Sequence, residues 1–600
     1  MHLRTAVLVV LGLAPVPAIL ASCSSDQGGS TFDEESGASH GNWGTGGPGS
    51  TTTPTGGGGA GVATTGATGS CGAGCTNDES GAGTASPFDP KNHDSSNVST
   101  DADGALVLDL AATSGQSLIW IASSKGNVVS KVDTTTFQEL GRFATGSGDP
   151  SRTSVDALGN VYVGNRKGGS VTKILSAGDK CPDTNGDGVV TTSHGPNEVL
   201  PYGQDDCKVW ETALGDHLIR GVAVQDSYKQ IPPSDPDLPP TIEETHVVWV
   251  GTTDGILWRI DGETGKVLAT TPSPCPVYGL ALDGKGQLWM TNNGCVGRVD
   301  TTKCLDDASC NAIQVCETSC GAGGNCPDTC DAAAKQKIKM PDGTYGITVD
   351  FKQRVWLAGG NGIKRYAHYA PAAQRYAAAA PSGFSHGIAA DANGFVWGAR
   401  DPEVVRVNGD TLEQTIVKTP SSKGMAVDKQ GKIWAISYQK AFATVITPGP
   451  GITDNTITNN AVTGLVGPYT YSDMTGLQAA LAMNGPGHYL ETLEGCANGA
   501  TRWVSLAWDA EVPKGSTVMF RVRTADDKAA LAKATWVLAA QVPTATSPID
   551  LEARLVKAGV TPGRYLDLDV WLWLDGDDPT VKSPRVKNLS VGHTCPPKVD

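Results

Sequence analysis

Gly279-Leu280-Ala281-Leu282-Asp283 opens a short phrase that closes, six residues after the aspartate, at Trp289. The phrase recurs along the chain, and its clear copies keep the same six-residue step from aspartate to aromatic residue. The step joins Asp350 to Trp356, Asp391 to Trp397, Asp428 to Trp434 and Asp156 to Tyr162, while Trp120 and Trp249 stand in two less regular copies. Seven copies at a period of roughly 40 residues indicate a repeat architecture.

Each copy has the pattern of short strands joined by turns. In the copy that contains Trp289, residues 278–282 and 287–291 are apolar runs separated by a Gly/Asp turn, and a third run covers 296–300. One such sheet cannot bury both of its faces alone, whereas sheets stacked radially bury them against their neighbours. We therefore predict a seven-bladed β-propeller, in which the repeated Trp and Tyr side chains form the core between sheets.

Composition agrees with an all-β fold. Glycine accounts for 75 of 600 residues, charged residues make up only 18%, and apolar residues at helical spacing are nearly absent beyond residue 20. The net charge is −16, and no lysine and arginine cluster is present. Because nucleic acids and anionic lipid headgroups both require a positive patch, we expect neither as a partner.

Shifts in composition divide the chain into segments. We expect a signal peptide at 1–22, a disordered Gly/Ser/Thr-rich tether at 23–93, the propeller at 94–450 with insertions at 176–219 and 301–341, a connecting strap at 451–486 and a β-sandwich at 487–600. In the last segment, strict alternation over 565–574 predicts a strand with one apolar face. Its other face, with Asp569, Trp571 and Trp573, resembles the sugar-stacking surface of carbohydrate-binding modules, but we favour packing of this face against the propeller or a second sheet.

The N-terminus predicts export and lipidation. Arg4 precedes a short apolar run, and Leu20-Ala21-Ser22-Cys23 resembles a bacterial lipobox. This resemblance implies cleavage before Cys23, lipid attachment to Cys23, and location in the cell envelope at the outer membrane, with the anchor as the only membrane contact. An ordinary secretory signal with an incidental cysteine is the alternative.

Cysteine usage favours an oxidising compartment, since fourteen cysteines remain without Cys23. We expect three disulfides from positions that bracket insertions, strands or the last domain: Cys181 with Cys207, Cys275 with Cys295, and Cys496 with Cys595. A second group lies in one insertion, and its pairing is open: Cys304, Cys310, Cys316, Cys320, Cys326 and Cys330. A zinc site is the rival interpretation of that group, but the spacings are not paired Cys-x-x-Cys and no histidine is nearby.

One insertion carries a calcium motif. Asp183, Asn185 and Asp187 hold positions one, three and five of an EF-hand-type loop, with Gly188 at the sharp turn and the Val189 carbonyl at seven. The loop is similar to those of dockerin or thrombospondin type-3 modules. Position twelve is His194 rather than glutamate, so Glu198, Asp205 or Asp206 would have to substitute. A structural Ca²⁺ ion is the prediction, and a metal-free turn the alternative.

The blade phrase as a whole, Gly-Ile-Ala-x-Asp-x-x-Gly-x-x-Trp, resembles the repeats of virginiamycin B lyase and NHL-type propellers over about residues 105–450. The resemblance implies a propeller fold and, for the lyase, a magnesium ion held by His and Glu side chains near the channel. The lyase repeats commonly have glutamate three positions after the aromatic residue. Here those positions carry no carboxylate: Ser123, Asn165, Thr252, Asn292, Gly359, Arg400 and Ser437.

Pseudosymmetry predicts where a ligand binds. The residue before each inner-strand glycine, or before Arg152 where that glycine is replaced, recurs once per blade and should line one channel mouth: Ser151, Arg220, Tyr278, Tyr345, His386 and Lys423. Arg400 would join a neighbouring circle. This mixed set suits a polar or anionic small molecule or a glycan; solvent-facing loop side chains are the alternative.

Three function classes follow. The preferred one is a surface- or periplasm-exposed lipoprotein that binds a ligand or partner without turnover. The second is a metal-dependent lyase or lactone hydrolase with His386 as acid or base. The third is an envelope scaffold that binds envelope proteins.

Overall fold

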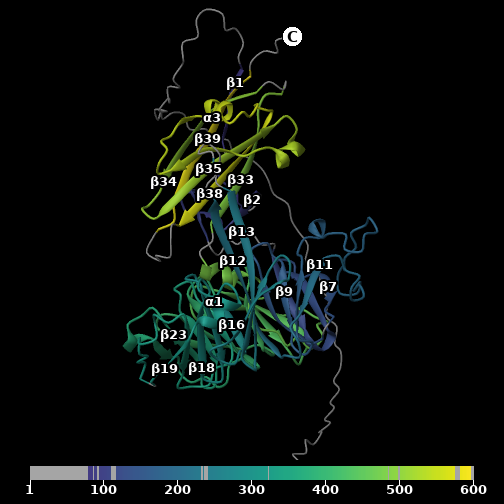
Figure 1. Cartoon of the computed structure of the whole chain (residues 1–600), viewed down its shortest axis with the longest axis vertical. Coiled ribbons are helices and arrows are strands. Elements are labelled where there is room, and N and C mark those ends of the chain that lie inside the picture. The colour runs from purple at the N-terminus through teal and green to yellow at the C-terminus, as the bar shows by residue number, and fades with distance from the viewer. Residues whose placement is uncertain are drawn as a thin grey trace, which may run out of the picture. The chain divides into compact units, whose positions relative to one another are not determined.

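The computed structural model of the chain describes residues 79–84, 87–90, 93–109, 117–146, 148–231, 234, 241–321, 323–483, 486–497, 501–574 and 582–595. These residues form an all-β structure (Figure 1), which confirms the predicted fold class at that level. Its helices are short: α1 (Asp307–Ala312), α2 (Leu477–Met483) and α3 (Leu551–Lys557), with 3₁₀ turns at Ser124–Gly126, Gly178–Lys180, Ala372–Gln374 and Lys528–Lys533. Within the described ranges no helix has the length and apolar character needed to cross a membrane. Cys23 lies outside these ranges.

Seven sheets follow one another between Leu118 and Val462 (Figure 1). Sheet by sheet, their strands are β5 (Leu118–Ser123), β6 (Val128–Asp133), β7 (Glu139–Ala144); β8 (Pro150–Val155), β9 (Val161–Asn165), β10 (Ser170–Ile174), β11 (Lys208–Ala213); β12 (Ile219–Ile231), β13 (Thr241–Thr252), β14 (Ile256–Asp261), β15 (Val267–Pro272); β16 (Gly279–Leu282), β17 (Gln287–Asn292), β18 (Cys295–Asp300), β19 (Val315–Ser319), β20 (Lys335–Lys339); β21 (Ile347–Val349), β22 (Val355–Gly359), β23 (Gly362–Tyr366), β24 (Tyr376–Ala378); β25 (Ile388–Ala390), β26 (Phe395–Arg400), β27 (Glu403–Asn408), β28 (Gln414–Val417); and β29 (Gly424–Val427), β30 (Ile433–Ser437), β31 (Phe442–Pro448), β32 (Asn455–Val462). Neighbouring strands are antiparallel except β19 and β20.

A hydrogen bond explains the six-residue step of the repeat. The Asp283 carboxylate accepts the indole N–H of Trp289 at 2.9 Å, and its other oxygen accepts the backbone N–H groups of Lys285 and Gln287. The aspartates at 350, 391 and 428 hold their tryptophans in the same way at 2.8 Å. All these indole rings are fully buried. The aspartate therefore fixes both the turn and the orientation of the ring that packs between sheets.

Successive sheets contact one another through their first strands, from β8 through β12, β16, β21 and β25 to β29. Glycine is required where these strands approach closely: a Cβ on Gly346 would lie 2.2 Å from the carbonyl oxygen of His386. A Cβ on Gly424 would lie 2.2 Å from the carbonyl oxygen of Thr470 in the same manner. The segment 469–474 thus takes the place of a first strand beside β29.

The same segment completes the first sheet. The backbone N–H of Trp120 in β5 donates to the carbonyl of Met474 at 2.9 Å, and Arg152 in β8 forms a parallel bridge with Tyr471. We predicted a strap over 451–486, but its boundaries are wrong, because residues 455–462 form β32 of the seventh sheet and 469–474 lie beside β5. The sequence does not indicate β32 as a strand, because its largely exposed residues are mostly polar and show no apolar alternation.

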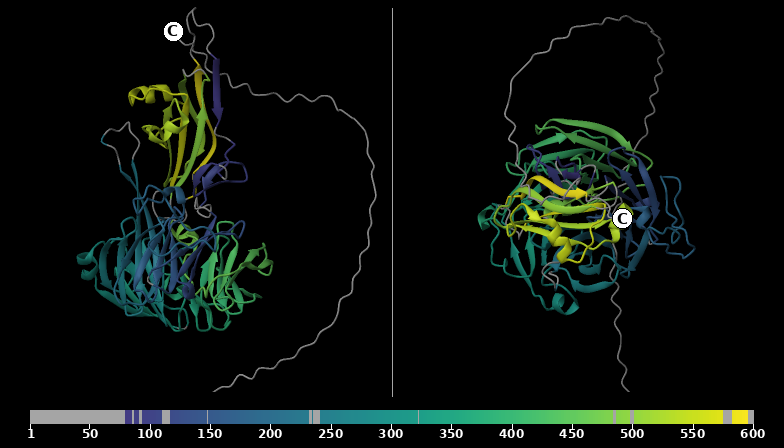
Figure 2. Two further views of the ribbon diagram at one scale, coloured as in Figure 1. Left: turned by 90° about the vertical axis from the view of Figure 1, so that its right-hand side faces the viewer. Right: turned by 90° about the horizontal axis from the view of Figure 1, so that it is seen from above.

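Two further sheets share one apolar core. One contains β1 (Glu79–Thr84), β3 (Val98–Thr100), β4 (Leu106–Leu108), β34 (Arg502–Glu511), β37 (Ile549–Asp550) and β39 (Arg585–Cys595); the other contains β2 (Asp94–Ser96), β33 (Gly487–Glu494), β35 (Ser516–Ala525), β36 (Val537–Val542) and β38 (Tyr565–Leu574). Fully buried side chains of β34, β35, β38 and β39 meet in that core. Figure 2 shows strands from both halves of the chain side by side there.

This pairing corrects two domain boundaries. Residues 79–84 fall within the predicted disordered tether, yet they pair with β39. Residues 94–108 fall within the predicted propeller, yet β2 pairs with β33, and β4 pairs with β39. The seven sheets are therefore inserted between strands of the two-sheet domain. Backbone hydrogen bonds to distant strands, rather than a local apolar pattern, stabilise these short strands.

The insertions are also shorter than predicted. Strand β11 lies inside the predicted insertion 176–219, and β20 inside 301–341, because each forms the fourth strand of its sheet. Six disulfides cross-link the described residues, and they include the three expected pairs, Cys181–Cys207, Cys275–Cys295 and Cys496–Cys595. The remaining pairs are Cys304–Cys310, Cys316–Cys330 and Cys320–Cys326, so these six cysteines are disulfide-bonded rather than free to bind zinc.

Candidate functional site

Four tyrosines, here named the tyrosine cluster, meet where the first strands begin. Tyr278 precedes β16, Tyr345 precedes β21, and Tyr469 and Tyr471 come from the segment that completes the first sheet. Hydrogen bonds join the Tyr278 and Tyr345 hydroxyls to that of Tyr469, each at 2.8 Å, and Tyr345 to Tyr471 at 2.9 Å. The Tyr278 and Tyr345 hydroxyls are 3.0 Å apart. Three separate parts of the chain therefore form one hydroxyl network.

Cations surround this network. The Arg152 guanidinium is fully buried 4.2 Å from the Tyr471 ring, and it donates to the carbonyls of Arg220 and Ser151 at 2.8 and 2.9 Å. Arg220 lies 4.6 Å from the Tyr278 ring, and its Nε and Nη1 atoms are buried without a hydrogen-bond partner. Lys423 lies 5.8 Å from the rings of Tyr345 and Tyr469. The site thus concentrates positive charge beside phenol hydroxyls.

The hydroxyl network separates the pKa values of its members. Burial alone would raise the pKa of Tyr469, but hydrogen bonds from the three other tyrosines and the charge of Arg152 lower it to about 7. Burial raises the pKa values of Tyr278, Tyr345 and Tyr471. Tyr469 is therefore the phenol that releases a proton most easily here.

His386 lies beside Tyr345, with ring centroids 5.4 Å apart. Burial and the nearby Lys423 lower the pKa of His386 to about 4, so its imidazole is neutral at pH 7. Its Nδ1 is buried without a hydrogen-bond partner. His386 is consequently a weaker base than the sequence suggests, although it contacts the cluster as expected.

Of the seven residues predicted at the mouth, the structure brings five side chains together: Arg220, Tyr278, Tyr345, His386 and Lys423. Ser151 is buried beside them, and its carbonyl accepts from Arg152. Arg400 does not contact the tyrosine cluster. It forms an ion pair with Glu403 at 3.3 Å instead. Sequence reasoning missed Arg152, Tyr469 and Tyr471 as site residues. Asp473, which follows Tyr471, resembles the repeat aspartate and could have marked this segment as another copy. No aromatic residue stands six positions after it, however, so the repeat pattern is incomplete.

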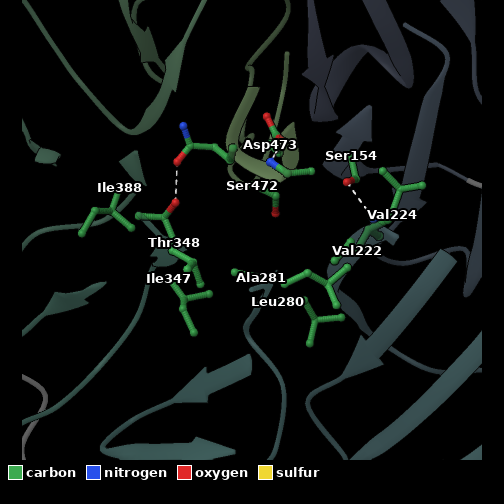
Figure 3. Close-up of a pocket in the computed structure, with 15 residues that line it drawn as sticks. Ser154, Val222, Val224, Leu280, Ala281, Ile347, Thr348, Ile388, Ser472 and Asp473 are labelled. Carbon is green, nitrogen blue, oxygen red and sulfur yellow. Dashed lines mark hydrogen bonds between the residues drawn. The ribbon is translucent and has the colours of Figure 1, made fainter. Parts of the chain in front are cut away.

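Below the mouth, the first strands enclose a cavity of only about 30 Å³ (Figure 3). Its lining is mostly apolar and includes Val222, Leu280 and Ile347. Ser472 and Asp473 of the segment 469–474 also line it. Gln478 of α2 accepts hydrogen bonds from the Thr348 hydroxyl and from the backbone N–H of Ala390. A volume of this size corresponds to about one water molecule, so the space between the first strands does not admit a larger ligand.

The cluster does not fit the magnesium ion that the lyase resemblance implies. A hard divalent cation requires oxygen anions, whereas the groups here are guanidinium, ammonium and phenol. Within the described ranges, His, Cys, Asp and Glu side chains converge in sufficient number to ligate a metal only at Cys496, His593 and Cys595, and two of these form a disulfide.

The predicted calcium loop is an exposed turn wrapped around Asp183. Its carboxylate accepts the backbone N–H groups of Gly186, Asp187 and Gly188; Asn185 accepts from Asp187, and Asp187 accepts from Val189. Asp205 and Asp206 bind nearby Ser and Thr groups instead. Calcium binding stays a prediction.

The outer face of β38 carries ion pairs. Arg521 donates to Asp569 at 2.6 Å and Arg523 donates to Asp567 at 2.8 Å. The Arg521 guanidinium also lies 5.3 Å from the Trp571 ring. A cation therefore already occupies the ring face that a sugar would use.

Neither a protein-family model nor a curated protein matches the chain. Among solved structures, a functionally unknown protein from Desulfotomaculum acetoxidans is 14% identical with a TM-score of 0.36, over 57% of this chain and 99% of that one. Virginiamycin B lyase from Staphylococcus aureus is 14% identical with a TM-score of 0.34, over 54% of this chain and 89% of the lyase. Likenesses this distant leave the function to be argued from the site itself.

Proposed function

We propose that the seven sheets are the blades of a closed seven-bladed β-propeller, that the two-sheet domain is a β-sandwich, and that the protein binds a polar or anionic ligand at the propeller mouth. Closure is supported by the equivalent approaches of Gly346 to His386 and of Gly424 to Thr470. A ring closed by segments from both ends of its sequence leaves no open sheet face.

The unpaired guanidinium of Arg220 is the main support for the ligand proposal. Two of its guanidinium nitrogens are buried without a hydrogen-bond partner beside the tyrosine cluster. Leaving a buried charged donor unpaired costs free energy, about 1–3 kcal/mol or more. A carboxylate or phosphate bound there would satisfy those donors through charge-assisted hydrogen bonds.

The experiment is calorimetric titration of the protein with small carboxylates, phosphates and acidic sugars. Arg220→Ala should weaken binding at least tenfold. Arg400→Ala is the matched control, because Arg400 pairs with Glu403 and should leave affinity unchanged. Equal affinity of the two variants would show that the ligand does not use the mouth. Co-purification of envelope proteins without small-ligand binding would favour the scaffold alternative.

A carbon–oxygen lyase is the second candidate, and Tyr469 rather than His386 would supply its base. With a pKa of about 7, the Tyr469 phenol is partly ionised at neutral pH and can accept a proton from carbon next to a carboxylate. Turnover of an acidic polymer to unsaturated products, lost in Tyr469→Phe but retained in His386→Ala, would establish it.

We further propose that a lipid on Cys23 holds the protein at the outer membrane. The lipobox-like sequence supports this, and the disulfides of the described domains agree with an oxidising compartment. Cys23→Ser should abolish fatty-acid labelling and release the protein from membranes. Unchanged labelling would exclude Cys23 as the lipidated residue.

A further inference from the structure

Tyr469 also lines a second and larger hollow. Its volume is about 340 Å³, and its walls include Lys125, Asp149, Arg166, Lys167 and Tyr438. This volume lies at the lower end of the range for small-molecule sites, about 300–1,000 Å³. The hollow and the tyrosine cluster share one wall, the Tyr469 side chain, so one extended ligand can reach both.

The charges of the hollow are mostly positive. The Arg166 guanidinium lies 5.1 Å from the Tyr469 ring, and the Lys125 ammonium 5.4 Å from the Tyr438 ring. Lys167 is largely exposed, with its ammonium 3.6 Å from the single carboxylate of the lining, that of Asp149. An anionic group on a ligand would therefore find two exposed ammonium groups, of which that of Lys167 is shared with the Asp149 carboxylate.

Asp149 adds a hydrogen-bond acceptor to this positively charged lining. One carboxylate oxygen, Oδ2, accepts from Arg166, whereas Oδ1 is buried without a hydrogen-bond partner. The backbone fixes this carboxylate, since Asp149 and Asn127 both adopt left-handed φ angles, 59° and 53°, and the Asp149 N–H donates to the Asn127 side chain at 2.8 Å. A ligand hydroxyl that donates to Oδ1 would satisfy this buried, unpaired acceptor.

Few ligand classes meet all these demands. A simple inorganic anion can pair with the lysines but has no apolar face to pack on an aromatic ring. A neutral sugar can donate a hydrogen bond to Asp149 but cannot pair with the lysines. A uronic acid has a carboxylate, hydroxyl donors and C–H faces that pack on aromatic rings. The rings of Tyr438 and Tyr469 stand edge to face with centroids 5.3 Å apart and offer such a surface.

We propose that this hollow is a subsite for one uronic-acid residue of an acidic oligosaccharide, whose adjoining residue occupies the mouth beside Arg220. The inference deepens the proposed function and rests on it, because the mouth must hold the first sugar. The two subsites are joined across Tyr469, so affinity should rise with the length of the saccharide.

The test is calorimetric titration with galacturonate, tetragalacturonate and the neutral maltotetraose. In the wild type, tetragalacturonate should bind at least tenfold more tightly than galacturonate, and maltotetraose should not compete. The double variant Lys125→Gln/Lys167→Gln should lose that gain from length. The control Lys352→Gln/Lys418→Gln removes two exposed lysines that pair with Asp410 and Glu403 outside the hollow, and should keep the gain.

The outcomes separate the two proposals. If the double lysine variant still binds tetragalacturonate at least tenfold more tightly than galacturonate, while Arg220→Ala weakens the binding of both, the subsite is overturned and the mouth remains. Binding that fails in the double lysine variant but survives in Arg220→Ala overturns the joint site and the mouth proposal together. Inorganic phosphate that binds as tightly as tetragalacturonate overturns the saccharide assignment.

Discussion

Replacing Trp397 by phenylalanine tests whether the aspartate–tryptophan hydrogen bond stabilises the sheets. The substitution keeps an aromatic ring in a fully buried position but removes the indole N–H that donates to Asp391 at 2.8 Å. Hydrogen bonds to charged groups contribute about 1.5–3 kcal/mol, whereas neutral ones contribute about 0.5–1.5 kcal/mol. We therefore expect Trp397→Phe to lower the free energy of unfolding by about 2–4 kcal/mol, including the loss of ring volume.

Trp120→Phe is the matched control. Its ring is also fully buried, but its indole N–H donates to a backbone carbonyl, that of Gly159, at 3.1 Å. Because the volume lost is the same, the difference between the two variants isolates the carboxylate bond, about 1–1.5 kcal/mol. Urea unfolding at pH 7 with the disulfides intact measures both variants. Equal losses would refute a stabilising role for the carboxylate.

The pH dependence gives a second criterion. Burial raises the pKa of Asp391 and the indole N–H partly offsets this, so the Trp397→Phe variant should have a still higher pKa there. A carboxyl whose pKa is raised by folding loses stability as pH rises from its unfolded value through its folded value. The penalty of Trp397→Phe should therefore grow as pH rises above the unfolded pKa of about 3.9, while that of Trp120→Phe should stay constant. A constant penalty for both would mean that Asp391 is not the acceptor.

Three further outcomes are expected. Removing the Cys496–Cys595 disulfide, which spans 99 residues, should cost about 4.7 kcal/mol in the chain-entropy limit, against about 2.2 kcal/mol for Cys304–Cys310, which spans 6. Similar losses in urea unfolding would contradict that ranking. Tyr469 should titrate near pH 7 in ultraviolet difference spectra of wild type against Tyr469→Phe, and absence of that phenolate signal would exclude the lowered pKa. Because folding lowers the pKa of Tyr469, wild type should gain stability relative to the variant between pH 7 and about 10. Millimolar Ca²⁺ should protect the 176–207 insertion of wild type from proteolysis but not that of Asp183→Ala, and equal protection would exclude a calcium loop at Asp183.

The sequence predicts those features that local patterns encode. The step from Asp283 to Trp289 marks a turn and a buried ring within one sheet, and Cys275 with Cys295 bracket neighbouring strands, so both could be derived without a structure. Tyr278 and Tyr345 were found because they occupy equivalent positions before β16 and β21.

The remaining features depend on distant pairing. Tyr469 and Tyr471 reach the cluster because their segment lies beside β5, more than 300 residues earlier in the sequence, and no local spacing reveals that. Residues 79–84 form β1 through backbone bonds to β39, which their Gly-rich composition does not indicate. The pairing of the six cysteines between 304 and 330 follows the fold of one insertion, which spacing alone leaves open.

The insertion of the seven sheets between strands of the two-sheet domain has a consequence for biogenesis. Glu79, among the first described residues to be synthesised, pairs with Cys595, among the last. Strand β1 must therefore wait with an unpaired edge until residues 590–595 have been synthesised, and such edges promote aggregation. Closing so long a loop is slow even when the final state is stable. A chain truncated before residue 585 would consequently lack the partner of β1 and expose that edge permanently.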